Sequence, residues 1–331
     1  MILAIESTCD ETGAAVVKKR RGMAEVLSNE IASSSEMHVK YGGIVPEVAA
    51  REQVKVIGTV IFEAMQKAEV SWDEIEAVAV AYGPGLMGSL LVGVETAKAL
   101  AYINKKPLLA VNHMEAHVLA NWIGQEPKLP AVGLVVSGGH TDLIYIKSIN
   151  DWTWLGGTRD DAAGECFDKC ARALGLPYPG GPSIQKAAEG ASGSATKLPR
   201  PLRDDSGFEM SFSGLKAAVA REVGTGGVDE DKRANLAKEV NEAIVESLVT
   251  KTMAAVNEKT PRSVLLAGGV AASKLLREEL EKMTKRMGIR LYMPEFKFCT
   301  DNAAMIGAAA MLRPKKVSLF ELRPEPGLEV I

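Results

Sequence analysis

The sequence predicts an α/β fold built from a duplicated unit, and three observations support this prediction. Strand-like and helix-like segments alternate over residues 77–112, as "AVAVAY", "GSLLVGVETAKALAYI" and "PLLAVN". Two stretches, "LAIESTCDETGAAVV" from Leu3 and "GLVVSGGHTDLIYI" from Gly133, share one pattern: a buried strand, a tight turn of small and polar residues, and a second strand. Near the C-terminus, "SVLLAGGVAASKLLREELEKM" adds another strand, glycine turn and helix.

The position of the second hairpin predicts where the chain divides. A length of 331 residues suits about two domains of about 150 residues each. The stretch "GQEPKLP", at residues 124–130, has the composition of a linker. We therefore expect an N-terminal lobe at residues 1–125, carrying a histidine pair, and a C-terminal lobe at residues 126–331 with glycine turns and additional helices.

Composition narrows the class of protein. A hydrophobic content of 47% with 24% charged residues is typical of a globular protein. The net charge of −3 argues against an overall basic coat for nucleic acid, although "KKRR" at Lys18 is a local basic cluster. Four scattered cysteines do not form a disulfide framework, and "ILAIES" directly after Met1 does not resemble a secretory signal. We expect a cytoplasmic protein with reduced thiols.

An uncharged run at residues 77–94 has the minimum length for a membrane span. It contains "YGPG" at its centre, however, and a proline flanked by glycines interrupts a helix and exposes backbone groups that lipid cannot satisfy. We therefore expect two short elements of a globular fold here, and no membrane span.

The stretch "NHMEAHV" carries two histidines at helical spacing. His113 and His117 would lie on one face of a helix, where both imidazoles could reach one metal ion. A metalloprotease of the HExxH type needs glutamate directly after the first histidine, whereas Glu115 lies about 200° around the helix from His113. The spacing of these residues leaves two hypotheses open. The histidines either form a metal site that lacks the base of a protease, or they are a solvated pair on the helix surface.

Three glycine-rich turns are candidates for binding a nucleotide. The motif "GPGLMG" at Gly83 matches GxGxxG, but the acidic residue that a dinucleotide fold places about 20 residues later is missing, and no P-loop sequence occurs. In "VVSGGHT", the amides of Ser137, Gly138 and Gly139 could form an anion-binding nest. The glycine pair of "LAGGVAAS" precedes a helix, where backbone donors could meet a ligand. Taken singly, each of the three is more often an ordinary turn.

Two acidic segments are further candidates. In "ESTCDET", Glu6, Asp10 and Glu11 either cap the turn or act as a general base or metal-phosphate contact. In "DDAAGECFDKCARALG", Asp168 shares one helical face with other acidic residues, which is usually a solvated face. The stretch "YPGGPSIQ" follows, and its Gly181 could bring backbone against a ligand.

These motifs together resemble the tRNA adenosine threonylcarbamoyltransferases, once labelled glycoprotein endopeptidases. The resemblance runs in order through "AIESTCDETGAAVV", "YGGIVPEVAAREQ", "AYGPGLMGSLLVG", "NHMEAH", "VVSGGHTDLI", "DDAAGECFDKCARALGLPYPGGP", "SFSGLK", "LAGGVAAS" and "CTDNAAMIG". The "STCDET" opening is similar to the bacterial and mitochondrial branch. The resemblance implies two ribonuclease-H-like lobes of the actin, sugar-kinase and Hsp70 type. It also implies transfer of a threonylcarbamoyl group from threonylcarbamoyl-AMP to the adenosine 3′ to the anticodon.

The resemblance also implies a metal site and a nucleotide site. His113, His117 and Asp301 would hold one divalent ion, iron in the first place and zinc as the alternative, although Asp301 alone would be interpreted as a helix-start residue. An adenylate or ATP-type nucleotide would contact a second set of residues. That set comprises Val135, Val136, Ser137, Gly138, Gly139, Asp168 and Gly181, with Gln185 and Ser273 where many members have an acidic residue and an asparagine.

The implied reaction is an acyl transfer in which Asp10 or Glu11 takes the proton from the attacking amine, with Asp10 favoured because it lies at the tip of the turn. The expected partners are tRNA, a paralogous subunit of the same fold and a small ATPase. Three alternatives are an ATPase or small-molecule kinase of the same fold, a metalloprotease, and a non-enzymatic nucleotide-dependent scaffold.

Overall fold

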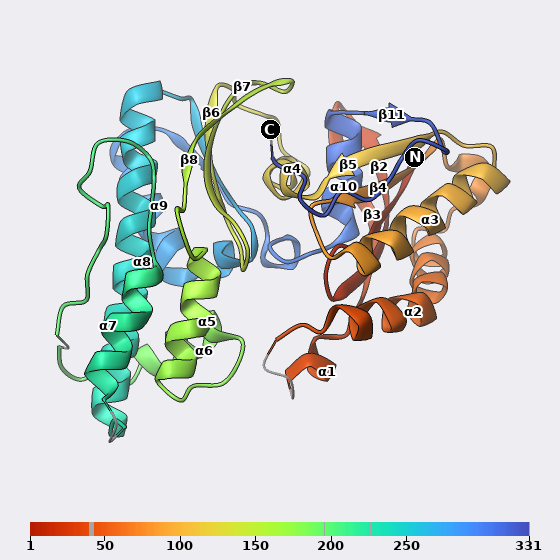
Figure 1. The fold of residues 1–331 in the computed structure, drawn as a ribbon. Helices are drawn as coiled ribbons and strands as arrows, with labels where there is room; N and C mark the ends of the chain where they lie inside the picture. Colours follow the sequence, from red (N-terminus) through yellow and green to blue (C-terminus); the bar gives the residue numbers. More distant parts are fainter. Residues whose placement is uncertain (40–42, 195, 225–226, 331) are drawn as a thin grey trace. The chain divides into compact units, whose positions relative to one another are not determined.

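The computed structural model describes residues 1–39, 43–194, 196–224 and 227–330 (Figure 1). Tyr41 and Gly42, which open the "YGGIVPEVAAREQ" motif, lie outside this part of the chain. The chain divides into two compact units. Unit 1 contains Met1–Pro127 together with the C-terminal segment from Pro294, and unit 2 contains Lys128–Met293.

The sheet of unit 1 has the strand order β11-β5-β4-β1-β2-β3. Strands β1, β4 and β5 run parallel, whereas β1, β2 and β3 form an antiparallel meander. The bounds are β1 (Ile2–Glu6), β2 (Glu11–Arg20), β3 (Met23–Ser33), β4 (Ala77–Gly83), β5 (Leu108–Asn112) and β11 (Lys316–Val317).

The sheet of unit 2 has the order β10-β9-β6-β7-β8. Strands β6, β9 and β10 are parallel, and β6, β7 and β8 form the second antiparallel meander. The bounds are β6 (Ala131–Val136), β7 (Thr141–Ser148), β8 (Asp151–Gly157), β9 (Ser263–Ala267) and β10 (Arg290–Tyr292).

The two sheets follow the same path. In each, a meander of three strands is followed by a parallel strand beside the first strand of the meander, and then by another parallel strand beside that one. The hairpins β1–β2 and β6–β7 are the two stretches that resemble each other in the sequence. The predicted α/β fold with a duplicated unit is confirmed.

The C-terminal segment changes the expected division of the chain. The second lobe was expected to continue to residue 331, but the segment from Pro294 belongs to unit 1. Two contacts explain this: β11 pairs with β5, and helix α10 (Ala303–Leu312) packs against β1 and β2. Unit 2 is therefore inserted in the sequence between two parts of unit 1.

Helices cover both faces of the unit 1 sheet. Alternate residues of β1 point to opposite faces. Leu3 and Ile5 join a core with α2 (Pro46–Lys67) and α3 (Met87–Ile103), whereas Ala4 faces Gly307 of α10. The remaining helical elements of this unit are α1 (Ser35–Val39), α4 (His113–Leu119) and the short 3-10 turns η1 (Trp72–Glu74), η2 (Ala120–Trp122) and η4 (Phe296–Phe298).

The uncharged run at residues 77–94 divides between β4 and α3, as predicted. The GPG turn, residues 83–85, separates the two elements because proline and glycine interrupt the regular backbone. Among the described residues, none of the helices has both the length and the apolar character that crossing a membrane requires.

Most of unit 2 between β8 and β9 is helical. The helices are α5 (Ala163–Ala173), α6 (Gly180–Ala188), α7 (Ser213–Val223) and α8 (Glu230–Lys259), and after β9 come η3 (Gly269–Ala272) and α9 (Lys274–Arg286). Asp160 holds the start of α7, accepting hydrogen bonds from the amides of Phe212 and Ser213 at 2.7 and 3.1 Å. Burial acts to raise the pKa of Asp160, but these and two hydroxyl hydrogen bonds outweigh it and lower the pKa.

A substitution at Gly307 tests how closely α10 approaches the sheet. A Cβ atom at Gly307 would lie 2.5 Å from Cγ2 of Val17 and 3.3 Å from Cβ of Ala4. We expect Gly307→Val to lower the free energy of unfolding by about 1–3 kcal/mol because the helix must move away from the sheet. Urea denaturation measures this. Gly58→Ala, on the exposed side of α2 with open space around it, is the matched control and should be neutral or stabilising. Equal stability of the Gly307→Val variant and wild type would contradict the packing.

Candidate active site

The histidine helix α4 begins directly at the end of β5. The Asn112 side chain caps it, accepting hydrogen bonds from the amides of Met114 and Glu115 at 2.8 and 3.2 Å. This cap fixes the start of the helix at His113, so that His113 and His117 lie on one face. Both residues are buried, with 7% and 2% of their surface exposed. The hypothesis that the two histidines are a solvated pair is therefore wrong.

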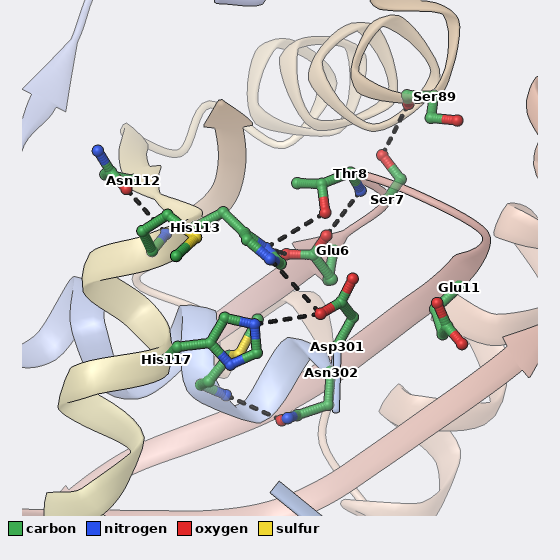
Figure 2. Close-up of polar contacts among 12 residues, drawn as sticks. Glu6, Ser7, Thr8, Glu11, Ser89, Asn112, His113, His117, Asp301 and Asn302 are labelled. Carbon is green, nitrogen blue, oxygen red and sulfur yellow. Dashed lines mark hydrogen bonds and ion pairs between the residues drawn. The ribbon is translucent and has the colours of Figure 1, made fainter. Parts of the chain in front are cut away.

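Asp301 completes a group of three potential metal ligands. Its Oδ1 lies 3.4 Å from Nε2 of His113 and 3.1 Å from Nε2 of His117 (Figure 2). The cap of α10 is Asn302, which accepts the Met305 amide at 3.1 Å. Asp301 is therefore not needed to start the helix, and its carboxylate faces the histidines.

The spacing of these atoms fits one metal ion. Ligands bound at about 2.1 Å in a tetrahedral arrangement lie about 3.4 Å apart, and the two measured separations are 3.1 and 3.4 Å. One ligand atom from each of the three residues lies within 4.8 Å of the others. Two imidazoles and one carboxylate suit iron or zinc and leave coordination positions for a substrate. The group could therefore hold one divalent ion.

The charges at this group favour a cation. Burial acts to raise the pKa of Asp301, but the two histidines outweigh it and hold the pKa well below its usual range. Burial acts to lower the pKa of His113, but Glu6 and Asp301 outweigh it and raise the pKa well above its usual value. Asp301 thus keeps its negative charge, and together with Glu6 it stabilises positive charge at His113.

Glu6 also contacts this group, which local sequence reasoning missed. Its carboxylate is fully buried at the end of β1. Oε2 lies 3.0 Å from Nδ1 of His113, and Oε1 accepts the Thr8 amide at 2.6 Å. The sequence groups Glu6 with the acidic turn, and its histidine partner lies 107 residues away. Only the pairing of the strands brings the two together.

The acidic turn between β1 and β2 is held from several elements. Gln53 on α2 is buried and donates to the carbonyl oxygens of Cys9 and Glu11, both at 3.0 Å. Ser89 on α3 donates to the Cys9 carbonyl at 2.9 Å. Ser34 donates to the Asp10 carbonyl at 3.0 Å. Gln53 belongs to the "VPEVAAREQ" stretch, whose contribution to the turn the sequence alone does not reveal.

Glu11 lies beside Asp301 in this arrangement (Figure 2). Burial, a hydrogen bond with Asp10 and the charge of Asp301 raise the pKa of Glu11 to about 9, and the Ser33 hydroxyl opposes this only in part. Glu11 is therefore protonated at neutral pH and can donate a hydrogen bond. The acidic turn and the three potential ligands thus form one site within unit 1.

Glu115 points away from the ligands, as its helical position predicts. Its carboxylate forms an ion pair with Arg313 at 2.8 Å. The general base that an HExxH protease places beside its ion is therefore absent from this helix. This arrangement does not support the protease alternative.

The serine-glycine turn of unit 2 follows β6. The side chains of Val135 and Val136 are fully buried, so a ligand could meet only their main chain. The Ser137 hydroxyl accepts the amides of Gly139 and His140 at 3.3 and 3.1 Å. The Gly139 amide, one of the three expected phosphate donors, therefore already has an acceptor, and a phosphate would have to replace the hydroxyl.

The glycines near this turn have different roles. A Cβ atom at Gly164 would lie 2.5 Å from the Ser137 carbonyl oxygen, and one at Gly268 would lie 2.4 Å from that of Val136. Gly268 also has a φ of +87°, which favours glycine. Gly138 and Gly139, in contrast, have open space around them. The first two glycines are structural, and the second two leave room for a ligand.

Four more expected contact residues lie on the helices of unit 2. Asp168 accepts the Gly180 amide at 2.7 Å, and burial raises the pKa of Asp168. Gly181 has open space around it. Gln185 accepts the Lys274 amide at 3.2 Å, and Ser273 caps α9 by accepting the Leu276 amide at 3.4 Å. Gln185 and Ser273 therefore meet at the start of α9.

Comparison with known proteins shows the family to which the chain belongs. The family model described as tRNA N6-adenosine threonylcarbamoyltransferase matches residues 25–308. A relative with this name from Clostridium botulinum is 47% identical over 99% of this chain and 97% of its own length. One from Symbiobacterium thermophilum is 50% identical over 93% of this chain and 90% of its own length.

Solved structures with low identity support the fold. HypF of T. kodakarensis has a TM-score of 0.62 at 13% identity and covers 94% of this chain and 47% of that chain. Component A of the Acidaminococcus fermentans (R)-2-hydroxyglutaryl-CoA dehydratase has a TM-score of 0.52 at 14% identity and covers 94% of this chain and 96% of that chain. These neighbours confirm the two-lobed actin and Hsp70 type of fold. The chain belongs to the tRNA N6-adenosine threonylcarbamoyltransferase family and is an acyltransferase that acts in the formation of threonylcarbamoyladenosine in tRNA.

Proposed function

We propose that this chain transfers the threonylcarbamoyl group from threonylcarbamoyl-AMP to the exocyclic amine of the adenosine 3′ to the anticodon, in tRNAs that read codons beginning with adenine. The observation that carries this proposal is the convergence of His113, His117 and Asp301 beside the acidic turn, in a member of this family. Acyl transfer needs a polarised carbonyl and an acceptor for the proton of the attacking amine. The site offers residues for both.

We propose that the three ligands hold one iron ion, with zinc as the alternative. When bound, the ion would supply a Lewis acid that polarises the oxygens of the threonylcarbamoyl group. The protein fixes both imidazoles by burying them and directs their Nε2 atoms toward Asp301. The burial also excludes water from one side of the group, which strengthens its electrostatic effect.

We propose Asp10 as the base that takes the proton of the amine. Glu11 has a pKa of about 9 and carries its own proton at neutral pH, so it is a poor acceptor. Its hydrogen bond with Asp10 would orient the neighbouring carboxylate. Gln53 and Ser34 hold the main chain of the two residues by hydrogen bonds to the carbonyl oxygens of Glu11 and Asp10.

We propose that the adenylate binds at the end of β6 and the nearby helix starts of unit 2. Parallel β6 and β9 end together, so the serine-glycine turn and the glycine pair at the start of η3 lie at one edge of the sheet. The residues that would contact the adenylate are Val135, Val136, Ser137, Gly138, Gly139, Asp168, Gly181, Gln185 and Ser273. The open space at Gly138, Gly139 and Gly181 supports this location.

The other functions explain less of the site. A kinase or ATPase of this fold would use a nucleotide but would have no role for the buried histidine pair. A scaffold would need neither an open metal position nor an acidic turn held from several elements. Threonylcarbamoyl transfer uses all of these features.

We propose that tRNA binding requires partner proteins, namely a paralogous subunit of the same fold and a small ATPase, and that the enzyme works in the cytoplasm with its tRNA. Affinity for tRNA depends largely on Lys and Arg neutralising phosphates. The chain has 39 basic and 42 acidic side chains, and only 5% of its residues are aromatic. Such a surface offers few phosphate contacts and few stacking platforms for unpaired bases.

The transfer reaction tests the function directly. Purified protein with the partner proteins, threonylcarbamoyl-AMP and unmodified tRNA should produce the modified nucleoside, detected by mass spectrometry after digestion. Asp10→Asn should lower turnover by about 10²–10⁴-fold because the base is lost, and Glu11→Gln should have a smaller effect. No modified nucleoside in the complete mixture would refute the function. A larger effect of Glu11→Gln than of Asp10→Asn would exchange their proposed roles.

Metal content tests the ligands. Both His113→Ala and His117→Ala should lose the bound ion, measured by elemental analysis of folded protein, because each removes one of three ligands. His38→Ala is the matched control, since His38 is also buried but contacts Ser34 at 3.2 Å instead of the ligand group. The control should keep its ion. Wild-type metal content in a folded double variant of His113 and His117 would refute the site.

Nucleotide affinity tests the serine-glycine turn. Gly139→Val should weaken AMP binding by about tenfold or more, or about 1.4 kcal/mol, while stability stays close to wild type because a side chain there meets no protein atom. Calorimetry with AMP measures the affinity. Gly268→Ala should show the reverse pattern, a loss of stability from close contact with Val136. Unchanged AMP affinity in Gly139→Val would mean that the turn does not bind the phosphate.

A further inference from the structure

We infer that Glu6 is a positioning residue that fixes His113 in the metal-binding tautomer and links this ligand to the acidic turn. The inference rests on the proposed metal site. Glu6 is fully buried, and its two carboxylate oxygens have different partners. Oε2 lies 3.0 Å from Nδ1 of His113, and Oε1 accepts the Thr8 amide at 2.6 Å (Figure 2).

The first contact determines which nitrogen of His113 can bind a metal. A carboxylate can only accept hydrogen bonds, so Nδ1 must carry the proton that it shares with Glu6. Thr8 Oγ1, at 3.2 Å from Nδ1, is a second acceptor for that proton. In the neutral imidazole, which is the form that binds a metal, Nε2 then has a free electron pair, and it is the atom that faces Asp301 at 3.4 Å. Such a carboxylate–histidine arrangement orients the ring and makes it a better ligand.

The second contact fixes the start of the acidic turn. The Thr8 amide is held by Glu6, and the Thr8 carbonyl accepts the Leu86 amide at 2.8 Å. Gly85 allows this approach, because a Cβ atom there would lie 2.5 Å from the Thr8 carbonyl oxygen. The GPG turn, which lacks the acidic residue of a dinucleotide motif, therefore has a defined role in holding Thr8. Glu6 thus joins a metal ligand to the turn that carries Asp10.

Glutamine cannot replace Glu6 in this arrangement, although it has almost the same shape. Both neighbours of the carboxylate, the Nδ1–H of His113 and the Thr8 amide, are donors. An amide side chain has one acceptor oxygen and one donor nitrogen. Glu6→Gln must therefore leave the buried Thr8 amide without an acceptor, or force His113 to place its proton on Nε2, where it blocks the metal.

The experiment compares Glu6→Gln, Glu6→Asp and a control, Glu239→Gln. Glu239 is a buried carboxylate of unit 2 that accepts the Leu198 amide at 2.9 Å and pairs with Arg200, so its loss also lowers stability. Competition with a chelator at fixed pH measures the zinc affinity. Nitrogen NMR of histidine-labelled, metal-free protein, at a pH at which the imidazole of His113 is neutral, identifies which of its nitrogens carries the proton. This signature would not change if Glu6 served stability alone.

We expect Glu6→Gln to weaken zinc binding by about 10–100-fold and to move the His113 proton from Nδ1 to Nε2. Glu239→Gln should change neither property. Glu6→Asp keeps two acceptor oxygens, so it should retain the Nδ1–H tautomer with an intermediate affinity, and it provides the test if Glu6→Gln does not fold. Wild-type zinc affinity with an unchanged tautomer in Glu6→Gln, or Nε2–H in folded Glu6→Asp, would overturn the inference. Undiminished zinc binding by His113→Ala would instead refute the metal site itself.

Discussion

The parallel pairing of β1, β4 and β5 is the constraint on which the site of unit 1 depends. Parallel strands end at the same edge of a sheet. The pairing therefore brings together Glu6 at the end of β1, the GPG turn after β4 and the Asn112 cap after β5. Successive contacts connect these features. Asn112 caps the helix that begins at His113, His113 contacts Glu6, and Glu6 accepts the Thr8 amide. The equivalent edge in unit 2 brings the turns after β6 and β9 together.

Packing around the acidic turn explains why so much buried polarity is tolerated there. A buried carboxylate is costly unless hydrogen bonds or opposite charges compensate for its lost hydration. Glu6 has two donors, Asp301 has two histidines, and the carbonyls of the turn have the Gln53 amide and serine hydroxyls. Glu11 is compensated differently, because its raised pKa removes the charge. The site thus combines ionised and neutral carboxyl groups within one small volume.

Local patterns predicted the hairpins, the helix phase of His113 and His117, and the orientation of Glu115, because alternation, caps and turn residues act over a few positions. Asp301 followed from a family resemblance, since nothing near it in the sequence indicates histidine partners. Glu6 and Gln53 were missed because their contacts join strands and helices that are distant in the chain. The amide of Gly139 was expected to be available to a ligand, but the hydroxyl of nearby Ser137 already accepts it. The sequence predicts elements better than it predicts which polar groups remain available.

The placement of Asp301 after the whole of unit 2 has a consequence for the newly made protein. His117 and Asp301 are separated by 184 residues, and a ribosome adding about 5–20 residues per second takes roughly 10–40 s to cover that interval. During that time the growing polypeptide has both imidazoles but lacks the carboxylate, the covering helix α10 and the edge strand β11. A ribosome that stops early releases a protein without a complete ligand set. The order of synthesis therefore delays the metal-binding group until nearly the entire protein has been made.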